Sequence, residues 1–387
     1  MRRVIILFNI VAFLFFTSFI MVQPILPIYI YNKLKLDEKE VGLIIGSLGF
    51  TSLLIRLLLP LGLFPRNVVK GILIGLCLNA VSISGYWISN SSLLVWIFRL
   101  LHGMSWGINH VLMLTFPSLV SENIVEKHVS LTSYTIFVAL GLCAGPAMAA
   151  LSILLIGNIY GVFIIATGMS VICLFIMNLV AKSKLISFTR KVLKISKRKI
   201  ATLLKTILRP AVIFSSSGFI LSAILSYGPL KASLELYLSE GLISSLFSLL
   251  YLAMLLSRIL LLMLKYESKL LTSLELIALI LCAVGMLLVS LSIGLTSYAI
   301  GMLLIGLGCG LTFPTTASEV ASKINDRFMV LGNAIYFIIY DIGYLTGPII
   351  ISLLLYMLPL AQAMTLSIMV PLTCAVTSYI IGRIKNL

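Results

Sequence analysis

Four residues with chemically active side chains recur at helical spacing between positions 99 and 110. Arg99, His102, Trp106 and His110 are separated by three, four and four residues, so they project from one face of an α-helix. A guanidinium group binds carboxylates and phosphates through paired donors, and an imidazole exchanges protons near neutral pH. This face therefore predicts a site for an anionic group, with a proton-exchanging side chain beside it.

The same spacing also fits a packed contact between helices, in which Arg99 and the histidines bond to neighbouring carbonyl groups. We prefer ligand binding for Arg99 and His102, whereas both interpretations stay open for Trp106 and His110. The candidate substrate-binding residues are polar or aromatic side chains of apolar segments: Gln23, Arg99, His102, Trp106, Asn109, His110 and Tyr227.

Charged residues inside apolar segments are a second signal, because each costs about 2.5–3.5 kcal/mol at the centre of a membrane helix. The clear cases are Arg56, Arg99, Arg258 and Asp341, and Asp341 is expected to be the only deeply placed acid. Proton coupling and a structural ion pair are equally open for Asp341. We hypothesise that Asp341 pairs with Arg56 between the two halves of the chain, whereas Arg258 is expected to be structural.

These residues lie in a chain whose composition excludes a water-soluble domain, since 60% of its 387 residues are hydrophobic and 10% are charged. Apolar runs of about 20 residues, the length that crosses a bilayer as a helix, recur throughout. We predict an all-α integral membrane protein with twelve transmembrane helices. The expected spans are 4–31, 41–63, 71–88, 93–120, 131–156, 159–181, 210–230, 242–264, 270–293, 298–318, 331–357 and 361–382.

The formal charge of +16 does not form a nucleic-acid-binding patch. With the amino terminus inside, 21 of the 28 Lys and Arg residues fall in cytoplasmic segments and four in external segments. This asymmetry predicts a multi-pass protein of the cell membrane with both termini in the cytoplasm. Ten of the 21 lie in 182–209, a basic cytoplasmic linker expected to contact anionic lipid headgroups.

The segments before and after this linker resemble each other. Tyr134, Gly141, Gly145 and Pro146 recur 202 positions later, and the same offset relates Arg56 to Arg258. We therefore predict two parallel six-helix repeats, at 1–181 and 210–387, with the solute path between them. The Gly-Pro pairs and their neighbouring glycines are candidate hinges: Gly141, Gly145, Pro146, Gly343, Gly347 and Pro348.

Gly141-x-x-x-Gly145-Pro146 and Arg99-x-x-x-Gly103 resemble signatures of the major facilitator superfamily, and the resemblance covers nearly the full chain. It implies the major facilitator fold, a cavity lined by helices 1, 4, 7 and 10, a bend at Pro24 and Pro27, and an exporter-like fifth helix. One departure is the 62–70 loop, which lacks the family's acidic residue and is expected to alter gating.

The resulting functional hypothesis is a monomeric secondary transporter, working by alternating access. It would move an anionic or amphipathic small molecule outward in exchange for protons. The sequence shows no Walker motif, and its six cysteines are not spaced as metal ligands, so we expect no cofactor, metal or catalytic residue. A transporter-like sensor or assembly protein is the alternative, and a membrane lipid enzyme is a weaker one.

Overall fold

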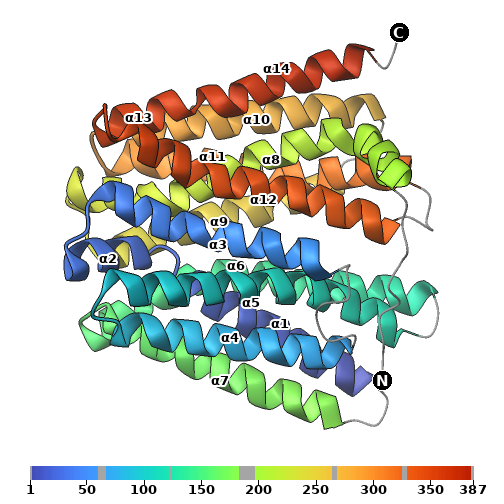
Figure 1. Cartoon of the computed structure of the whole chain (residues 1–387), viewed down its shortest axis with the longest axis horizontal. Coiled ribbons are helices and arrows are strands. Elements are labelled where there is room, and N and C mark those ends of the chain that lie inside the picture. Colours follow the sequence, from blue (N-terminus) through green and yellow to red (C-terminus); the bar gives the residue numbers. More distant parts are fainter. Residues whose placement is uncertain are drawn as a thin grey trace. The chain divides into compact units, whose positions relative to one another are not determined.

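The computed structural model describes residues 2–59, 67–121, 124–182, 197–263, 268–324 and 329–384. The long regular elements in these ranges are all α-helices (Figure 1). They are α1 (Arg2–Met21), α2 (Leu26–Leu34), α3 (Glu38–Leu58), α4 (Val68–Ile88), α5 (Ser92–Val120), α6 (Ile124–Ile156), α7 (Tyr160–Lys182), α8 (Lys197–Leu234), α9 (Glu240–Met263), α10 (Ser268–Ser290), α11 (Leu295–Lys323), α12 (Met329–Leu354), α13 (Leu360–Ser367) and α14 (Met369–Ile384).

Eleven helical stretches among the described residues are long and apolar enough to cross a membrane. The remaining expected span, 93–120, forms the 29-residue helix α5, which carries Arg99 and both histidines of the polar face. The all-helical membrane class is thus confirmed. The 62–70 loop, which lacks the acidic residue of the family pattern, lies outside the described residues except for its last four positions.

Prolines interrupt the first and last spans. The first divides into α1 and α2 around Pro24, and Pro27 stands at the second position of α2, which confirms the predicted bend. The last divides into α13 and α14 near Ile368, although the sequence predicted one span. Pro371 has no N–H group to donate to the Ser367 carbonyl, so the helix cannot continue its regular bonding there.

Helix α8 begins at Lys197, well inside the segment expected to be a linker. Leu203 and Ile207 are spaced along one face of this extension, and Lys205 lies between them. That is an amphipathic helix pattern, and Ile207 is fully buried. The linker residues 183–196 lie outside the described part of the chain.

The described residues group into two compact units. Unit 1 takes in 1–36, 50–193 and 240–248, and unit 2 takes in 37–49, 194–239 and 249–387. The first part of α3 therefore belongs to unit 2, and the first part of α9 belongs to unit 1. The predicted division into domains 1–181 and 210–387 stays a prediction.

Within each unit, the candidate hinge glycines lie at close helix contacts. A Cβ atom on Gly141 or Gly145 of α6 would lie within 3 Å of the backbone of α1. On α12, a Cβ atom on Gly343 would lie 2.0 Å from the Ser215 carbonyl oxygen of α8, and one on Gly347 would lie 2.6 Å from the Phe219 carbonyl oxygen. These glycines let α6 pack on α1 and α12 on α8, and their role as hinges stays a prediction.

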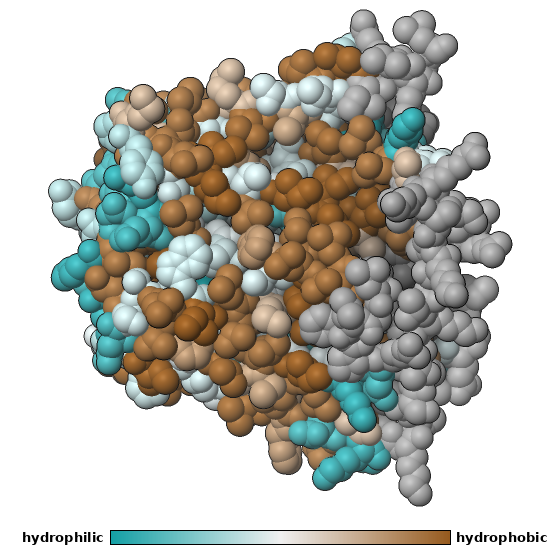
Figure 2. All heavy atoms as spheres, viewed as in Figure 1, coloured by the Kyte–Doolittle hydropathy of each residue, from teal (hydrophilic) through white to brown (hydrophobic). Residues whose placement is uncertain are grey.

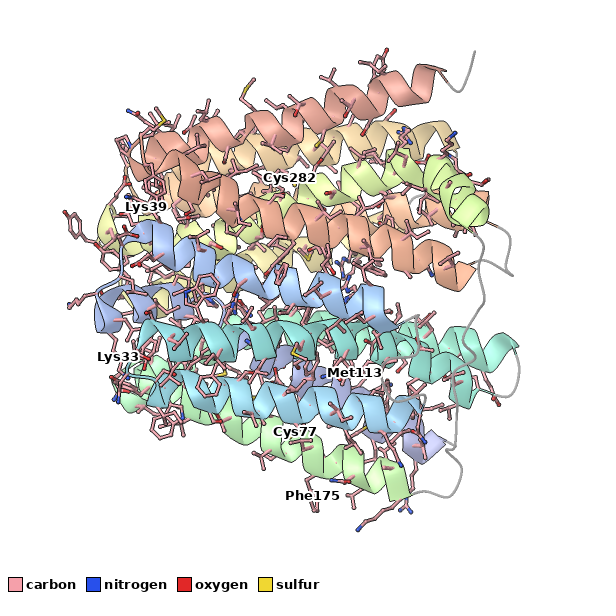
Figure 3. The ribbon with its side chains drawn as sticks, viewed as in Figure 1. Lys33, Lys39, Cys77, Met113, Phe175 and Cys282 are labelled. Carbon is pink, nitrogen blue, oxygen red and sulfur yellow. The ribbon has the colours of Figure 1, made fainter. Side chains whose placement is uncertain are left out.

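Large apolar side chains face outward on the described surface. Phe175, which projects from α7 (Figure 3), is 65% exposed, and Leu154 on α6 is 78% exposed. Figure 2 shows hydrophobic residues over most of the described surface in that view, with hydrophilic residues gathered mainly toward its left side. Apolar side chains outside and polar ones inside are the distribution expected for a protein surrounded by lipid.

Candidate functional site

Arg99 on α5 and Gln23 on the first span are in direct contact inside unit 1. Both side chains are buried, with Arg99 completely enclosed. Arg99 Nη2 donates to Gln23 Oε1 across 3.0 Å, and Gln23 Nε2 donates to the carbonyl oxygen of Phe19 across 3.3 Å. Gln23 lies in the break between α1 and α2, so the break places its amide beside the guanidinium group. Two candidate residues from distant segments are thus brought together.

Tyr86 on α4 connects Arg99 to His102. Its hydroxyl is in hydrogen-bonding contact with the Arg99 guanidinium and lies 2.9 Å from His102 Nδ1. A tyrosine hydroxyl both donates and accepts, so the tautomer of His102 decides which of the two groups donates in this bond. His102 Nε2 is buried with no hydrogen-bond partner among the described residues.

We call Gln23, Tyr86, Arg99 and His102 the Arg99 cluster. It presents the guanidinium donors of Arg99 and the unpartnered Nε2 atom of His102 within a fully buried region. Such a set suits a carboxylate or phosphate oxygen. The sequence did not point to Tyr86, because a tyrosine in an apolar segment resembles any other packed aromatic residue.

Trp106 and His110 continue the same face of α5 but meet different partners. The Trp106 ring stacks on Phe19 at 4.4 Å between centroids and lies 4.9 Å from the His110 ring. Arg56 Nη2 lies 3.4 Å from His110 Nδ1, with which it forms a hydrogen bond. Trp106 is therefore part of an aromatic contact between α1 and α5, whereas His110 is a hydrogen-bond partner of Arg56.

Asn109 in unit 1 and Tyr227 in unit 2 each make contacts within their own unit. Asn109 faces α4, where a Cβ atom on Gly75 would come within 2.4 Å of its Oδ1, and its Nδ2 lies 3.5 Å from Ser105 Oγ. Tyr227 is buried in unit 2, and its hydroxyl donates to the Pro348 carbonyl oxygen across 3.3 Å. Substrate binding by these two residues stays a prediction.

Asp341 is buried on α12 in unit 2, with 2% of its surface exposed. Arg56 is buried on the part of α3 that belongs to unit 1. The expected ion pair would join residues of different units, and it stays a prediction.

Asp341 is not the only buried acid in an expected span. Glu275 on α10 is completely buried, and its Oε2 lies 2.6 Å from Arg209 Nη2 on α8. Arg209 Nη1 also contacts Glu319 Oε2 on α11 at 2.5 Å. Glu275 lies inside the expected span 270–293, so the argument from charges in spans would have identified it.

Long apolar helices that bury polar groups inside each unit define a multi-pass membrane protein. The sequence matches the Major Facilitator Superfamily over residues 8–348. The chain therefore belongs to this superfamily of membrane transporters, as the sequence motifs indicated, and it is a transporter rather than an enzyme.

Solved structures of transporters have the same fold. The nucleoside transporter NupG is 13% identical, with a TM-score of 0.75 over 98% of this chain and 99% of that one. A bacterial homolog of the human lysosomal transporter Spinster is 11% identical, with a TM-score of 0.74 over 99% and 97%. The human organic anion transporter MFSD10 is 16% identical, with a TM-score of 0.70 over 97% and 99%. No curated protein matches the chain in sequence.

Proposed function

We propose that this protein is a secondary active transporter that exports a small anionic or amphipathic solute in exchange for protons. The observation that carries the choice of solute is the Arg99 cluster. An arginine side chain is a cation, and His102 Nε2 is proposed as a second donor, in the tautomer that accepts from Tyr86 at Nδ1. A solute carboxylate or phosphate would accept from both groups, and an apolar portion would suit the aromatic contact at Trp106.

Similarity of fold does not identify the solute, because one of the similar transporters is a nucleoside transporter and another is an organic anion transporter. The buried donors are therefore the stronger argument for an anion. Desolvation strengthens a charge-assisted hydrogen bond, so a few such donors are enough to hold a singly charged solute.

The proposed mechanism is alternating access by two six-helix halves in the cell membrane, with both termini in the cytoplasm. The constant offset of 202 positions supports the repeat, and so does the similar close packing of α6 on α1 and α12 on α8. The excess of Lys and Arg on one side supports the orientation. Asp341 is the residue proposed to couple proton movement to transport, either alone or paired with Arg56.

The first experiment identifies the solute class. Purified protein is screened by thermal shift against organic anions, sugars and cationic drugs, and the stabilising compounds are tested for transport in proteoliposomes. We expect stabilisation by amphipathic anions. Arg99→Lys should lose both stabilisation and transport, whereas Arg3→Lys, at an exposed arginine, should keep them. Selective stabilisation by sugars, or full activity of Arg99→Lys, would contradict the proposal.

The second experiment tests coupling and direction. Proteoliposomes loaded with the identified anion are given a proton gradient of either sign, with a dissipated gradient as the control. Export coupled to protons predicts anion movement against its own gradient only when protons flow the opposite way. An anion that binds but is never moved would instead favour the alternative of a transporter-like sensor.

A further inference from the structure

Two cysteine thiols meet inside unit 2, and the proposed transport cycle does not use them. Cys282 lies on α10 (Figure 3) and Cys309 lies on α11, and their Sγ atoms are 3.7 Å apart. Cys282 is completely enclosed, and Cys309 is 5% exposed. Both are free thiols, so the pair is open to chemistry that two adjacent thiols can do and a single thiol cannot.

The backbones of α10 and α11 are in direct contact beside this pair. A Cβ atom on Gly308, the residue before Cys309, would lie 3.0 Å from the Cys282 backbone nitrogen and 2.5 Å from its Sγ atom. Further along the same two helices, a Cβ atom on Gly285 or Gly301 would lie 2.7 Å from the carbonyl oxygen of the other. A disulfide needs two Cα atoms within about 7 Å of each other, and a contact between backbones favours that separation.

Little holds the two thiols in their present positions. A disulfide bond is about 2.05 Å long, so the two sulfur atoms must move about 1.7 Å closer. Cys282 Sγ lies 3.9 Å from the Ile305 carbonyl oxygen, and Cys309 Sγ lies 3.9 Å from the Ser217 carbonyl oxygen of α8. A thiol is a weak donor, so rotating either side chain away from its carbonyl gives up little.

The surroundings of the pair favour oxidation over metal binding. A closed structural site for a metal such as zinc has four ligands, usually Cys and His. No group of three or more His, Cys, Asp and Glu residues that could hold a metal ion occurs within the described ranges. The oxygen atoms nearest the thiols are backbone carbonyls, which suit hard ions rather than the soft ions that thiolates select.

We propose that Cys282 and Cys309 form a disulfide bond when a small uncharged oxidant, hydrogen peroxide, reaches them. One thiol passes two electrons to the peroxide and becomes a sulfenic acid, with release of one water molecule. The sulfur of the other thiol then attacks the sulfenic sulfur. The S–S bond forms, and the sulfenic hydroxyl leaves with the proton of the second thiol as another water molecule. Two thiols and one hydrogen peroxide thus give one disulfide and two waters.

The disulfide would change the contacts of three helices in unit 2. It ties α10 to α11 and removes the two S–H groups that lie near the Ile305 and Ser217 carbonyls. Helix α11 is then fixed to α10 and loses its thiol contact with α8. This inference does not depend on the solute or on the direction of transport.

Peroxide treatment of the purified, folded protein tests the pair directly. The remaining thiols are blocked with a maleimide under denaturing conditions, and the protein is digested and analysed by mass spectrometry without reduction. We expect a cross-linked peptide pair that contains Cys282 and Cys309 and that dithiothreitol separates. Absence of this product at a peroxide dose that oxidises the exposed Cys77 would overturn the proposal without needing a variant.

Matched variants test the pairing. Cys282→Ser and Cys309→Ser each leave one thiol of the pair, so neither should give the cross-linked product. Cys173→Ser is the control, because Cys173 is an equally enclosed thiol of unit 1 that donates to the Val11 carbonyl oxygen across 3.3 Å. This variant should give the product in the same yield as the unmodified protein. A main product that joins Cys282 or Cys309 to a different cysteine would refute the pairing.

Thermal melting gives a second readout. A disulfide between α10 and α11 constrains the unfolded chain, so the oxidised protein should melt at a higher temperature than the reduced protein. Dithiothreitol should reverse the rise, and Cys309→Ser should not show it. Equal melting temperatures of the oxidised and reduced forms would contradict a covalent link between the two helices. Neither readout measures transport, so these results stand apart from the success or failure of the proposed function.

Discussion

Replacing Gly343 by alanine should destabilise the protein strongly, because this glycine lies directly against α8. The added Cβ would be 2.0 Å from the carbonyl oxygen of Ser215. A carbon and a carbonyl oxygen in contact are normally about 3.3 Å apart, which leaves an overlap of about 1.3 Å. The oxygen belongs to the helix backbone, so no change of side-chain rotamer relieves the overlap.

The neighbouring contact prevents a simple adjustment of α12. One helical turn further on, a Cβ atom on Gly347 would meet Ser222 Oγ at 2.4 Å and the Phe219 carbonyl oxygen at 2.6 Å. Moving α12 away at Gly343 would therefore also open the contact at Gly347. Overpacking usually costs 1–3 kcal/mol, and a clash with rigid backbone places this substitution at about 3 kcal/mol or more.

Thermal unfolding of the purified protein, followed by far-ultraviolet circular dichroism, measures the effect. Gly168→Ala on α7 is the matched control, since no atom lies within 4 Å of its Cβ position, and it should gain up to about 1 kcal/mol of helix propensity. A Gly343→Ala protein as stable as this control would refute the reasoning. Unchanged stability with lost transport would instead support the hinge prediction.

Three further predictions concern buried polar groups. Tyr86→Phe removes the hydroxyl that bridges the cluster but keeps the ring, so it should weaken binding of the identified anion about tenfold, roughly the 1–2 kcal/mol of one buried hydrogen bond. Equal affinity in a thermal-shift titration would exclude that role for the bridge to His102. Arg209→Gln leaves buried Glu275 without its cation and should cost about 3–5 kcal/mol, and adding Glu275→Gln should restore most of the loss; failure of this rescue in melting experiments would argue against the ion pair. Asp341→Asn should abolish accumulation driven by a proton gradient but keep exchange of labelled for unlabelled solute, and accumulation at the normal rate would exclude proton coupling at this residue.

Local features of the fold were readable from the sequence because they depend on short stretches of chain. Runs of about 20 apolar residues give membrane helices, and Pro24 and Pro27 remove backbone donors where the first span divides. The first part of α8, residues 197–209, was not predicted as a helix because its many basic residues suggested a surface linker. Its apolar residues nevertheless recur at helical spacing, which could have predicted the helix.

The candidate site could be predicted only along one helix. The spacing of Arg99, His102, Trp106 and His110 correctly identified one face of α5, because helical periodicity is a local property. It could not show that Gln23 bonds to Arg99 from 76 positions away, since that contact depends on how α5 packs against the first span.

By itself, the sequence determined that the chain lies in a membrane, which stretches are apolar enough to cross it and which superfamily the chain belongs to. The tertiary structure decided which polar groups meet. It joined Arg99 to His102 through Tyr86, turned Asn109 toward α4, and brought Glu275 to Arg209. The physical reason is that hydrophobicity and helix formation act over neighbouring residues, whereas a buried hydrogen bond requires two helices to pack at one particular rotation and depth.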